Sequence, residues 1–272
     1  MKICIIGANG FLGRNITLQC LEKKYDVLAV YNNRKSNIPA GCKKMKYCDL
    51  LKSNLRFDIV FLAVGSFEST YKELIDTNIN VTQTICNKYK KAKIVFISSV
   101  NIYGFQKQTI TIKTSFNNTN IYGLSKIAGE FIVMNHPKYS IVRLTYLYGK
   151  EMNTNSFVPK IVQDAIEKNL ITLYGHGLRK QDYLNVKDAA ALCILAAQNN
   201  KNNVYLGATG CSITNQQVAE EIQTLIPGCK IKKTNTIDKA YSYSFNVKAT
   251  KKELNWNPKH TLQEGLKEMI LK

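Results

Sequence analysis

Three glycines at intervals of three residues follow a short apolar run at the N-terminus of the chain. The run covers residues 2–6, the glycines are Gly7, Gly10 and Gly13, and residues 15–23 have the pattern of an amphipathic helix. A glycine turn between a first strand and a first helix lets a pyrophosphate approach the backbone, where the helix N-terminus offers free amide groups. In that context the triplet predicts a dinucleotide-binding fold more strongly than it would elsewhere in a chain.

Apolar runs and helical patterns alternate through the first half of the sequence. Alternation of this kind predicts an α/β fold, a Rossmann-type doubly wound parallel sheet that binds ligands beyond the carboxyl ends of its strands. The predicted strands after the first cover residues 25–34, 44–50, 58–65, 94–99 and 139–149, and long helices cover residues 71–90 and begin again at Tyr122.

The pattern changes after Gly149, where short strands and helices are joined by polar loops. No segment repeats at a fixed period, and no low-complexity linker divides the chain. We therefore predict an NAD(P)-binding domain of residues 1–152 plus 183–205, and a smaller C-terminal α/β substrate-binding lobe of residues 153–182 and 206–272.

Composition narrows the class of protein. The chain has 272 residues, 45% of them hydrophobic, and a formal net charge of +19. Its lysines are spread along the whole sequence without a basic tract, which indicates a solvated surface rather than a nucleic-acid site. No apolar run reaches the roughly 18 residues of a membrane span, and the N-terminal run is too short for a signal peptide. We expect a cytoplasmic protein with no nucleic-acid or membrane partner and, since its cysteines lack metal-ligand spacing, no metal site.

Tyr122 and Lys126 lie four residues apart at the start of a predicted helix, downstream of two serines that close a predicted strand. Residues at that spacing share one face of a helix. A phenol beside an ammonium and a serine hydroxyl can transfer protons to or from a substrate oxygen.

The end of the second predicted strand bears on the choice of cofactor. An acidic residue there would bind the adenosine 2′-hydroxyl and favour NAD. The sequence has Asn32, Asn33, Arg34 and Lys35 instead. Arg34 suits a 2′-phosphate, with Arg14 as a second candidate. We therefore favour NADP(H), with NAD(H) as the alternative.

Several motifs in register resemble one known family. The segments GANGFLG (residues 7–13), SSVNIYG (98–104), YGLSK (122–126), VRLTYLYG (142–149) and DYLNVKDAA (182–190) occur in that family's order. Together they resemble the extended short-chain dehydrogenase/reductase family, in its branch of NAD(P)-dependent nucleotide-sugar epimerases, dehydratases and reductases.

The resemblance implies a role for each motif residue. Tyr122 would be the general acid/base, Lys126 would lower the pKa of the phenol and hold the nicotinamide ribose, and Ser99 would hydrogen-bond the reacting oxygen. Cofactor contacts are then expected from Gly7, Asn9, Gly10, Phe11, Leu12, Gly13, Asn33, Arg34, Asp49, Leu50, Leu62, Ala63, Val64, Tyr122 and Lys126. Substrate contacts are expected from Ser99, Asn101, Tyr146, Phe157, Lys160, Tyr174 and Arg179.

Departures from the family pattern narrow the chemistry. Many dehydratases of this branch carry two acids after the catalytic hydroxyl, where this chain has Val100 and Asn101, so dehydration is disfavoured. Many members have an arginine for the substrate diphosphate where this chain has Gln181. Either Arg179 or Lys180 takes over that contact, or the substrate is held differently.

These observations predict NADP(H)-dependent reduction of a nucleotide-activated 4-keto sugar. A nucleotide-sugar 4-epimerase that retains NAD is the alternative, since the same three residues serve it. A non-catalytic cofactor-sensing or RNA-binding protein on the same fold is a third hypothesis, disfavoured because a binding protein needs no tuned phenol. The expected partner is a nucleotide-diphosphate sugar, and the resemblance implies a possible homodimer.

Overall fold

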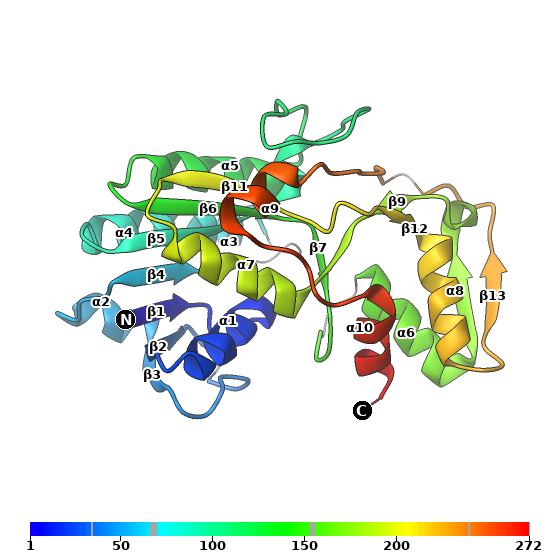
Figure 1. Cartoon of the computed structure of the whole chain (residues 1–272), viewed down its shortest axis with the longest axis horizontal. Coiled ribbons are helices and arrows are strands. Elements are labelled where there is room, and N and C mark those ends of the chain that lie inside the picture. The colour runs from blue at the N-terminus through cyan, green and yellow to red at the C-terminus, as the bar shows by residue number, and fades with distance from the viewer. Residues whose placement is uncertain (34, 66–69, 153–155, 239, 272) are drawn as a thin grey trace.

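A seven-stranded parallel sheet organises the computed structural model, which describes all residues except 34, 66–69, 153–155, 239 and 272 (Figure 1). The strand order is β11-β6-β5-β4-β1-β2-β3, and every pair of neighbours is parallel. The bounds are β1 Lys2–Ile6, β2 Asp26–Tyr31, β3 Lys43–Lys46, β4 Ile59–Leu62, β5 Lys93–Ser99, β6 Tyr139–Leu144 and β11 Asn203–Gly207. The predicted Rossmann-type α/β fold is confirmed.

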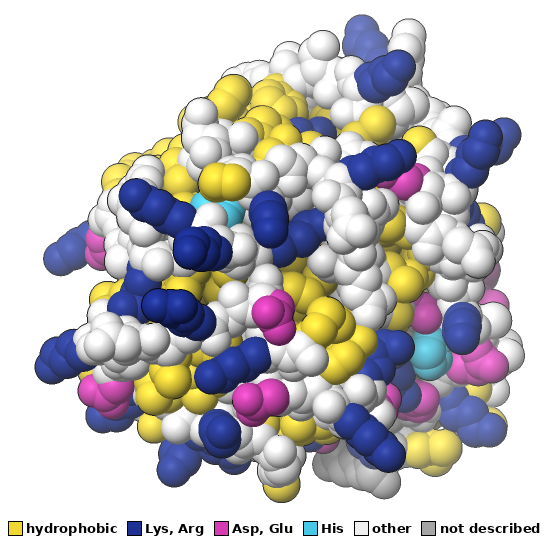
Figure 2. All heavy atoms as spheres, turned by 60° about the vertical axis from the view of Figure 1, so that its left-hand side comes forward, with side chains coloured by type: hydrophobic (Ala, Val, Ile, Leu, Met, Phe, Trp, Pro, Cys, Tyr) yellow, Lys and Arg dark blue, Asp and Glu magenta, His cyan; other side chains and the backbone are white. Residues whose placement is uncertain are grey.

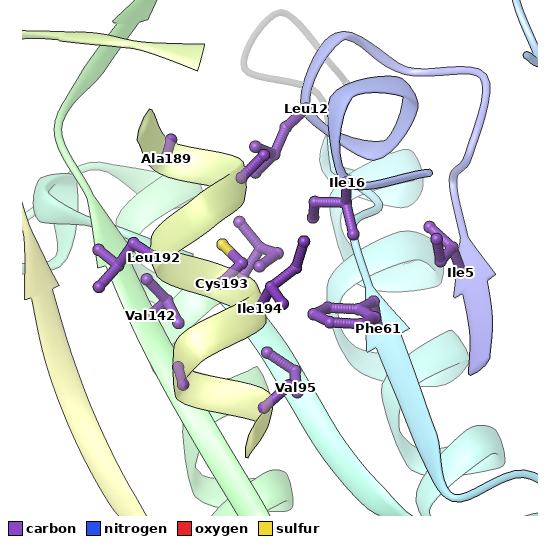
Figure 3. Close-up of a cluster of buried hydrophobic side chains, with 14 of the residues drawn as sticks. Ile5, Leu12, Ile16, Phe61, Val95, Val142, Ala189, Leu192, Cys193 and Ile194 are labelled. Carbon is purple, nitrogen blue, oxygen red and sulfur yellow. The ribbon is translucent and has the colours of Figure 1, made fainter. Parts of the chain in front are cut away.

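Helices cover both faces of the sheet. On one face α1 (Phe11–Glu22) and α7 (Val186–Gln198) pack against strand residues such as Ile5 and Phe61, as Figure 3 shows. On the other face lie α2 (Tyr47–Lys52), α4 (Val81–Lys88) and α5 (Ile121–Met134). A π-helical turn, η1 (Asp76–Asn80), joins α4 to α3 (Tyr71–Ile75), so residues 71–88 form one continuous helix.

The strand order reverses direction between β1 and β4. The chain runs from β1 outward to β2 and β3, then returns to β4 on the other side of β1 and continues outward to β5, β6 and β11. In open α/β sheets the crevice beyond the carboxyl ends at such a switch point is where ligands bind. Here Gly7 follows β1 and Ala63 follows β4, so both border that crevice.

A smaller set of elements lies beyond one end of the sheet and has its own apolar core (Figure 1). Its members are β7 (Tyr146–Tyr148), α6 (Phe157–Lys168), β8 (Leu170–Leu173), η3 (Tyr174–Gly177), β9 (Lys180–Gln181), β10 (Tyr183–Asn185), β12 (Ile213–Thr214), α8 (Asn215–Leu225), β13 (Lys230–Lys233) and α10 (Leu262–Ile270). Helix α9 (Lys248–Leu254) instead packs its Leu254, with Trp256, into the core of the large sheet. The predicted division into domains remains a prediction.

Two predicted strands were wrong in extent. Residues 44–50 do not form one strand, because β3 ends at Lys46 and α2 begins at Tyr47, which places Leu50 in the core below the sheet. Residues 139–149 form two strands separated at Thr145. There the chain leaves the large sheet, and β7 pairs with β10 instead.

One face of the molecule shows how its charged side chains are distributed (Figure 2). On the face shown in Figure 2, lysines and arginines are scattered and acidic side chains lie among them, which agrees with the expectation of a solvated, lysine-rich surface. Within the described parts of the chain, every helix is too short or too polar to cross a bilayer. In the same parts no three His, Cys, Asp or Glu side chains gather as a metal site would require.

Candidate active site

The loop between β1 and α1 can be built only with glycine at two positions. Gly7 has φ +86°, and a Cβ added to it would lie 2.6 Å from the carbonyl oxygen of Ala63. A Cβ on Gly13 would lie 2.1 Å from the carbonyl oxygen of Gly7, because α1 packs directly on the loop. The first amides of the helix, next to Gly10, have no intrahelical acceptor. This geometry fits the pyrophosphate of a dinucleotide.

Tyr122, Lys126 and Ser99 come together beside that loop. Ser99 ends β5, and Asn120 caps α5 by accepting a 2.9 Å bond from the amide of Gly123, which places Tyr122 in the first turn. A hydrogen bond joins the side chains of Ser99 and Tyr122. The Lys126 Nζ lies 5.9 Å from the centre of the Tyr122 ring.

Lys126 is buried and bonded to two backbone carbonyls. Its Nζ donates to the oxygens of Ile97 (2.9 Å) and Val64 (3.2 Å), and it lies 5.0 Å from the centre of the Phe96 ring. The ammonium therefore links the ends of β4 and β5 at the crevice. An ammonium has three donors, and these carbonyls occupy two of them.

Burial is the main cause of the pKa shifts of Tyr122 and Lys126. It raises the pKa of Tyr122 to about 12, against a smaller lowering by the hydrogen bond with Ser99. It lowers the pKa of Lys126 to about 7, against a raising contribution from Glu130. In the protein alone, burial is the larger effect on the pKa of the phenol, and the expected lowering of that pKa by Lys126 stays a prediction. The other expected contribution, the positive charge of an oxidised nicotinamide, belongs to the cofactor.

A cavity of about 950 Å³ opens next to the phenol. Five predicted residues line it: Ser99, Asn101, Tyr122, Tyr146 and Arg179. Its other walls come from the loop before α5, from the segment after β6 and from residues near the C-terminus. Lining residues that the sequence did not predict are Asn118, Thr119, Thr145, Ser156, Asp182, Tyr241 and Tyr243. Gln181, which stands where many family members have an arginine for the diphosphate, lines the cavity as well.

Three residues predicted to bind substrate lie elsewhere. Phe157, Lys160 and Tyr174 are not among the described residues that line the cavity. Lys160 pairs with Asp164 one helical turn away at 3.1 Å, and Tyr174 is 58% exposed. These contacts were expected from the family resemblance, whereas part of the cavity wall comes from far along the chain, from Ala240, Tyr241 and Tyr243.

The residues predicted to bind cofactor fall into two groups. Asn9, Gly10, Phe11 and the residues after β4, Ala63 and Val64, border the crevice. Leu12, Leu50 and Leu62 are buried in the sheet's apolar cores, and Asp49 is exposed on α2 rather than at a strand end.

At the adenosine end, Asn33 lies in an exposed bend after β2, and Arg34 falls outside the described residues. Arg14, in the first turn of α1, forms an ion pair with Glu151.

Comparison with known proteins agrees with this geometry. Residues 3–206 match the NAD dependent epimerase/dehydratase family. The chain is 24% identical to UDP-glucuronic acid decarboxylase 1 of Arabidopsis thaliana, over 99% of this chain and 69% of that protein. It is 22% identical to dTDP-glucose 4,6-dehydratase of Haemophilus influenzae, over 99% and 97% of the two chains.

Solved structures share the fold. MoeE5 in complex with UDP-glucose and NAD superposes with a TM-score of 0.86 at 19% identity, over 100% of this chain and 98% of that one. UDP-glucose 4-epimerase of Thermotoga maritima gives 0.85 at 19% identity, with the same coverage. The family match covers the glycine loop, Ser99, Tyr122 and Lys126, and it confirms the expected class of NAD(P)-dependent enzyme. The chain belongs to the NAD dependent epimerase/dehydratase family.

Proposed function

We propose that the chain reduces a ketone on a nucleotide-activated sugar, with Tyr122 as the proton donor. The observation that carries this proposal is the Tyr122 phenol at the wall of the cavity, which is hydrogen-bonded to Ser99 and whose pKa burial raises to about 12. Reduction requires an acid at neutral pH, and such a phenol remains one. A bound reduced nicotinamide would supply the hydride, Ser99 would hold the carbonyl oxygen, and Tyr122 would deliver the proton to that oxygen.

A 4-keto sugar nucleotide suits the lining of the cavity. Arg179 offers a guanidinium for the diphosphate, which its planar donors match. Near the phenol, Asn101, Asn118 and Thr145 present amides and a hydroxyl that can bond sugar hydroxyls. MoeE5 and the Thermotoga maritima epimerase were solved with UDP-glucose, and this supports the choice of substrate class.

The residues after Ser99 support ketone reduction over dehydration. Val100 and Asn101 carry no carboxylate that could remove a proton from carbon. Asp182 is the one acid among the described lining residues, and its carboxylate accepts bonds from Thr209 (2.8 and 2.9 Å) and Gly210 (2.8 Å). A carboxylate held by three donors serves as a structural anchor for residues 209–210.

We propose NADPH as the preferred hydride donor. The support is the sequence after β2, where Asn32, Asn33, Arg34 and Lys35 stand in place of an acid, and the nearby Arg14. Guanidinium groups suit a 2′-phosphate. NADH is the alternative, since the family is NAD dependent.

A 4-epimerase is the second candidate, and the size of the cavity favours it. About 950 Å³ lies near the upper end of the roughly 300–1,000 Å³ typical of ligand sites, which leaves room for a sugar to present either face. Ser99, Tyr122 and Lys126 would then act first in oxidation and later in reduction of the same carbon.

The homodimer is also proposed, on the apolar side chains that α3 and α5 expose. Ile75, Leu124 and Phe131 are 49%, 52% and 61% exposed, and exposed apolar patches mark interaction sites. Light scattering on the purified protein tests it: a monomer at all concentrations would exclude it.

The deciding experiment supplies a panel of nucleotide 4-keto sugars with NADPH or NADH and follows nicotinamide absorbance. Steady consumption of NADPH, faster than of NADH, is expected. Isomer formation without added cofactor would establish the epimerase instead. No conversion of any panel member by either route would refute both candidates.

A further inference from the structure

A buried ion pair lies directly behind the candidate active site. Arg143 on β6 is 6% exposed and Glu130 on α5 is 2% exposed. The guanidinium of Arg143 donates two hydrogen bonds to the carboxylate of Glu130, from Nε to Oε1 (3.0 Å) and from Nη2 to Oε2 (2.7 Å). The hydroxyl of Ser98 donates a third bond, 2.5 Å long, to Oε1. Fork geometry of this kind fixes orientation as well as charge.

Arg143 also contacts the turn after β5 and the loop before α5. Its Nη1 donates to the hydroxyl of Tyr103 at 3.0 Å. The guanidinium also lies near the adjacent rings of Tyr103 and Phe116, 5.3 and 5.4 Å from their centres. Arg143 therefore joins β6 to α5, to the turn after β5 and to the loop before α5.

The residues that the ion pair contacts are close in sequence to residues of the candidate active site. Ser98 directly precedes Ser99, and Glu130 lies one helical turn after Lys126. Phe116 lies two residues before Asn118, which lines the cavity. The pair thus sits where the elements that carry the hydroxyl, the phenol and the ammonium converge.

Stability alone does not account for this pair. Removing two charges from water is costly, and apolar residues of similar volume are often as stabilising as a buried ion pair. What apolar residues cannot provide is a fixed negative charge near the Lys126 ammonium, or a directed bond to Ser98. Burial disfavours the charged form of Lys126, and Glu130 opposes that effect.

We propose that Glu130 and Arg143 are a positioning pair for Ser99, Tyr122 and Lys126. They fasten the ends of β5 and β6 to α5, and the carboxylate shifts the equilibrium of Lys126 toward its charged form against the effect of burial. The effect on the rate rests on the proposed function, whereas the effect on Lys126 does not.

The test uses two single variants and one double variant of the full chain. Glu130→Gln keeps the shape of the side chain and removes its charge. Arg143→Met removes the guanidinium at similar length. Each single variant leaves one buried charge unpaired and is expected to lower the Tm. The double variant Glu130→Gln/Arg143→Met removes both charges and is expected to recover most of the lost Tm, which makes it the informative protein. Asp164→Asn, which removes the carboxylate that pairs with the exposed Lys160 and Lys168 outside the described lining of the cavity, is the matched control.

Two readouts separate positioning from stability. The first is the titration of the Lys126 Nζ by NMR in lysine-labelled protein, with the resonance assigned by its loss in Lys126→Met. Its midpoint is expected to fall by about one pH unit in Glu130→Gln and in the double variant. The second is the rate of ketone reduction at neutral pH, expected to fall by about tenfold or more in the folded double variant, while Asp164→Asn matches the wild type in both.

A folded double variant with the wild-type Lys126 midpoint and rate would overturn the proposal, because the pair would then serve stability alone. A shifted midpoint in a protein that reduces no ketone would uphold the pair's effect on Lys126 and count only against the proposed function. If the double variant does not fold, Arg143→Lys, which keeps the charge but loses the fork, is measured in its place: a wild-type rate in that variant would likewise overturn the proposal.

Discussion

Lys126 Nζ donates a 2.9 Å hydrogen bond to the carbonyl oxygen of Ile97, so a helix side chain fastens the end of β5 two residues before Ser99. Burial lowers the pKa of Lys126 from 10.5 to about 7. Between these values the unfolded chain binds a proton that the folded chain does not, so this group makes the folded protein more stable as pH rises through the window. We expect Lys126→Met to lack that rise. Near pH 7 its free energy of unfolding is expected to be at least that of the wild type, with an excess of about 1–3 kcal/mol.

Urea unfolding at both ends of the window measures the effect of Lys126→Met, and the difference between the two proteins isolates Lys126 from other titrating groups. Lys93, whose pKa burial lowers to about 8, is present in both proteins and cancels. A variant with the same pH slope as the wild type would contradict the prediction.

Replacement of Tyr122 by phenylalanine removes the proton donor and leaves the ring. We expect the rate of reduction to fall by roughly 10²–10⁴-fold, the usual contribution of general acid catalysis, with the dissociation constant for NADPH almost unchanged. Stopped-flow rates and cofactor fluorescence measure the two quantities. Tyr71→Phe, at an exposed position on α3, is the control. Wild-type turnover in Tyr122→Phe would rule out the assigned role.

Two glycines of the loop after β1 are expected to have different roles: Gly13 allows helix α1 to pack on the loop, and Gly10 allows the ligand to approach the backbone. In Gly13→Ala the new Cβ would lie 2.1 Å from the Gly7 carbonyl oxygen, whereas in Gly10→Ala it meets that oxygen at 3.3 Å and little else. We expect Gly13→Ala to lose about 1–3 kcal/mol of stability, as overpacked sites do, and Gly10→Ala to stay folded but bind the dinucleotide more weakly. Thermal unfolding and cofactor titration of both variants test this. The reverse order of stabilities would show that α1 does not pack on the loop as described.

The ion pair of Arg14 with Glu151 bears on cofactor choice, because it occupies a guanidinium that a 2′-phosphate could use. The two side chains are 31% and 53% exposed, and exposed pairs are worth only about 0–1 kcal/mol. We therefore expect Glu151→Gln to improve the affinity for NADPH over NADH by up to about fivefold at low salt, with a smaller gain at high salt. Lys160→Gln is a control that removes an exposed charge on α6. An equal change for both cofactors would show that Arg14 does not contact the 2′-phosphate.

Motifs made of neighbouring residues could be predicted from the sequence, since local geometry determines them. Spacing placed Tyr122 and Lys126 on one helix face, and Gly7 and Gly13 in the first turn. Residues 44–50 were misread because their pattern, KMKYCDL, suits a strand as well as a short helix. Helix α9 was missed because its segment, KATKKEL, has few apolar residues, and only Leu254 reaches the core.

The walls of the cavity could not be predicted, because they depend on contacts between distant segments. Tyr241 and Tyr243 line it together with Asn118, more than a hundred residues earlier. Arg143 did leave a signal: it is a charged residue inside the apolar strand β6, and a buried charge requires a buried partner. That partner, Glu130, lies on the apolar helix α5, four residues after Lys126.

The point at Thr145 where the chain leaves the large sheet bears on how the substrate preference of such a protein can evolve. The chain passes from the large sheet to β7 at that point, returns to α7 after β10, and crosses again between β11 and β12 and before α9. The part that holds the sugar is therefore interleaved with the part that holds the dinucleotide. A single genetic crossover cannot exchange one for the other, so new substrate preferences on this scaffold must arise by point substitutions and loop changes around a shared, unbroken core.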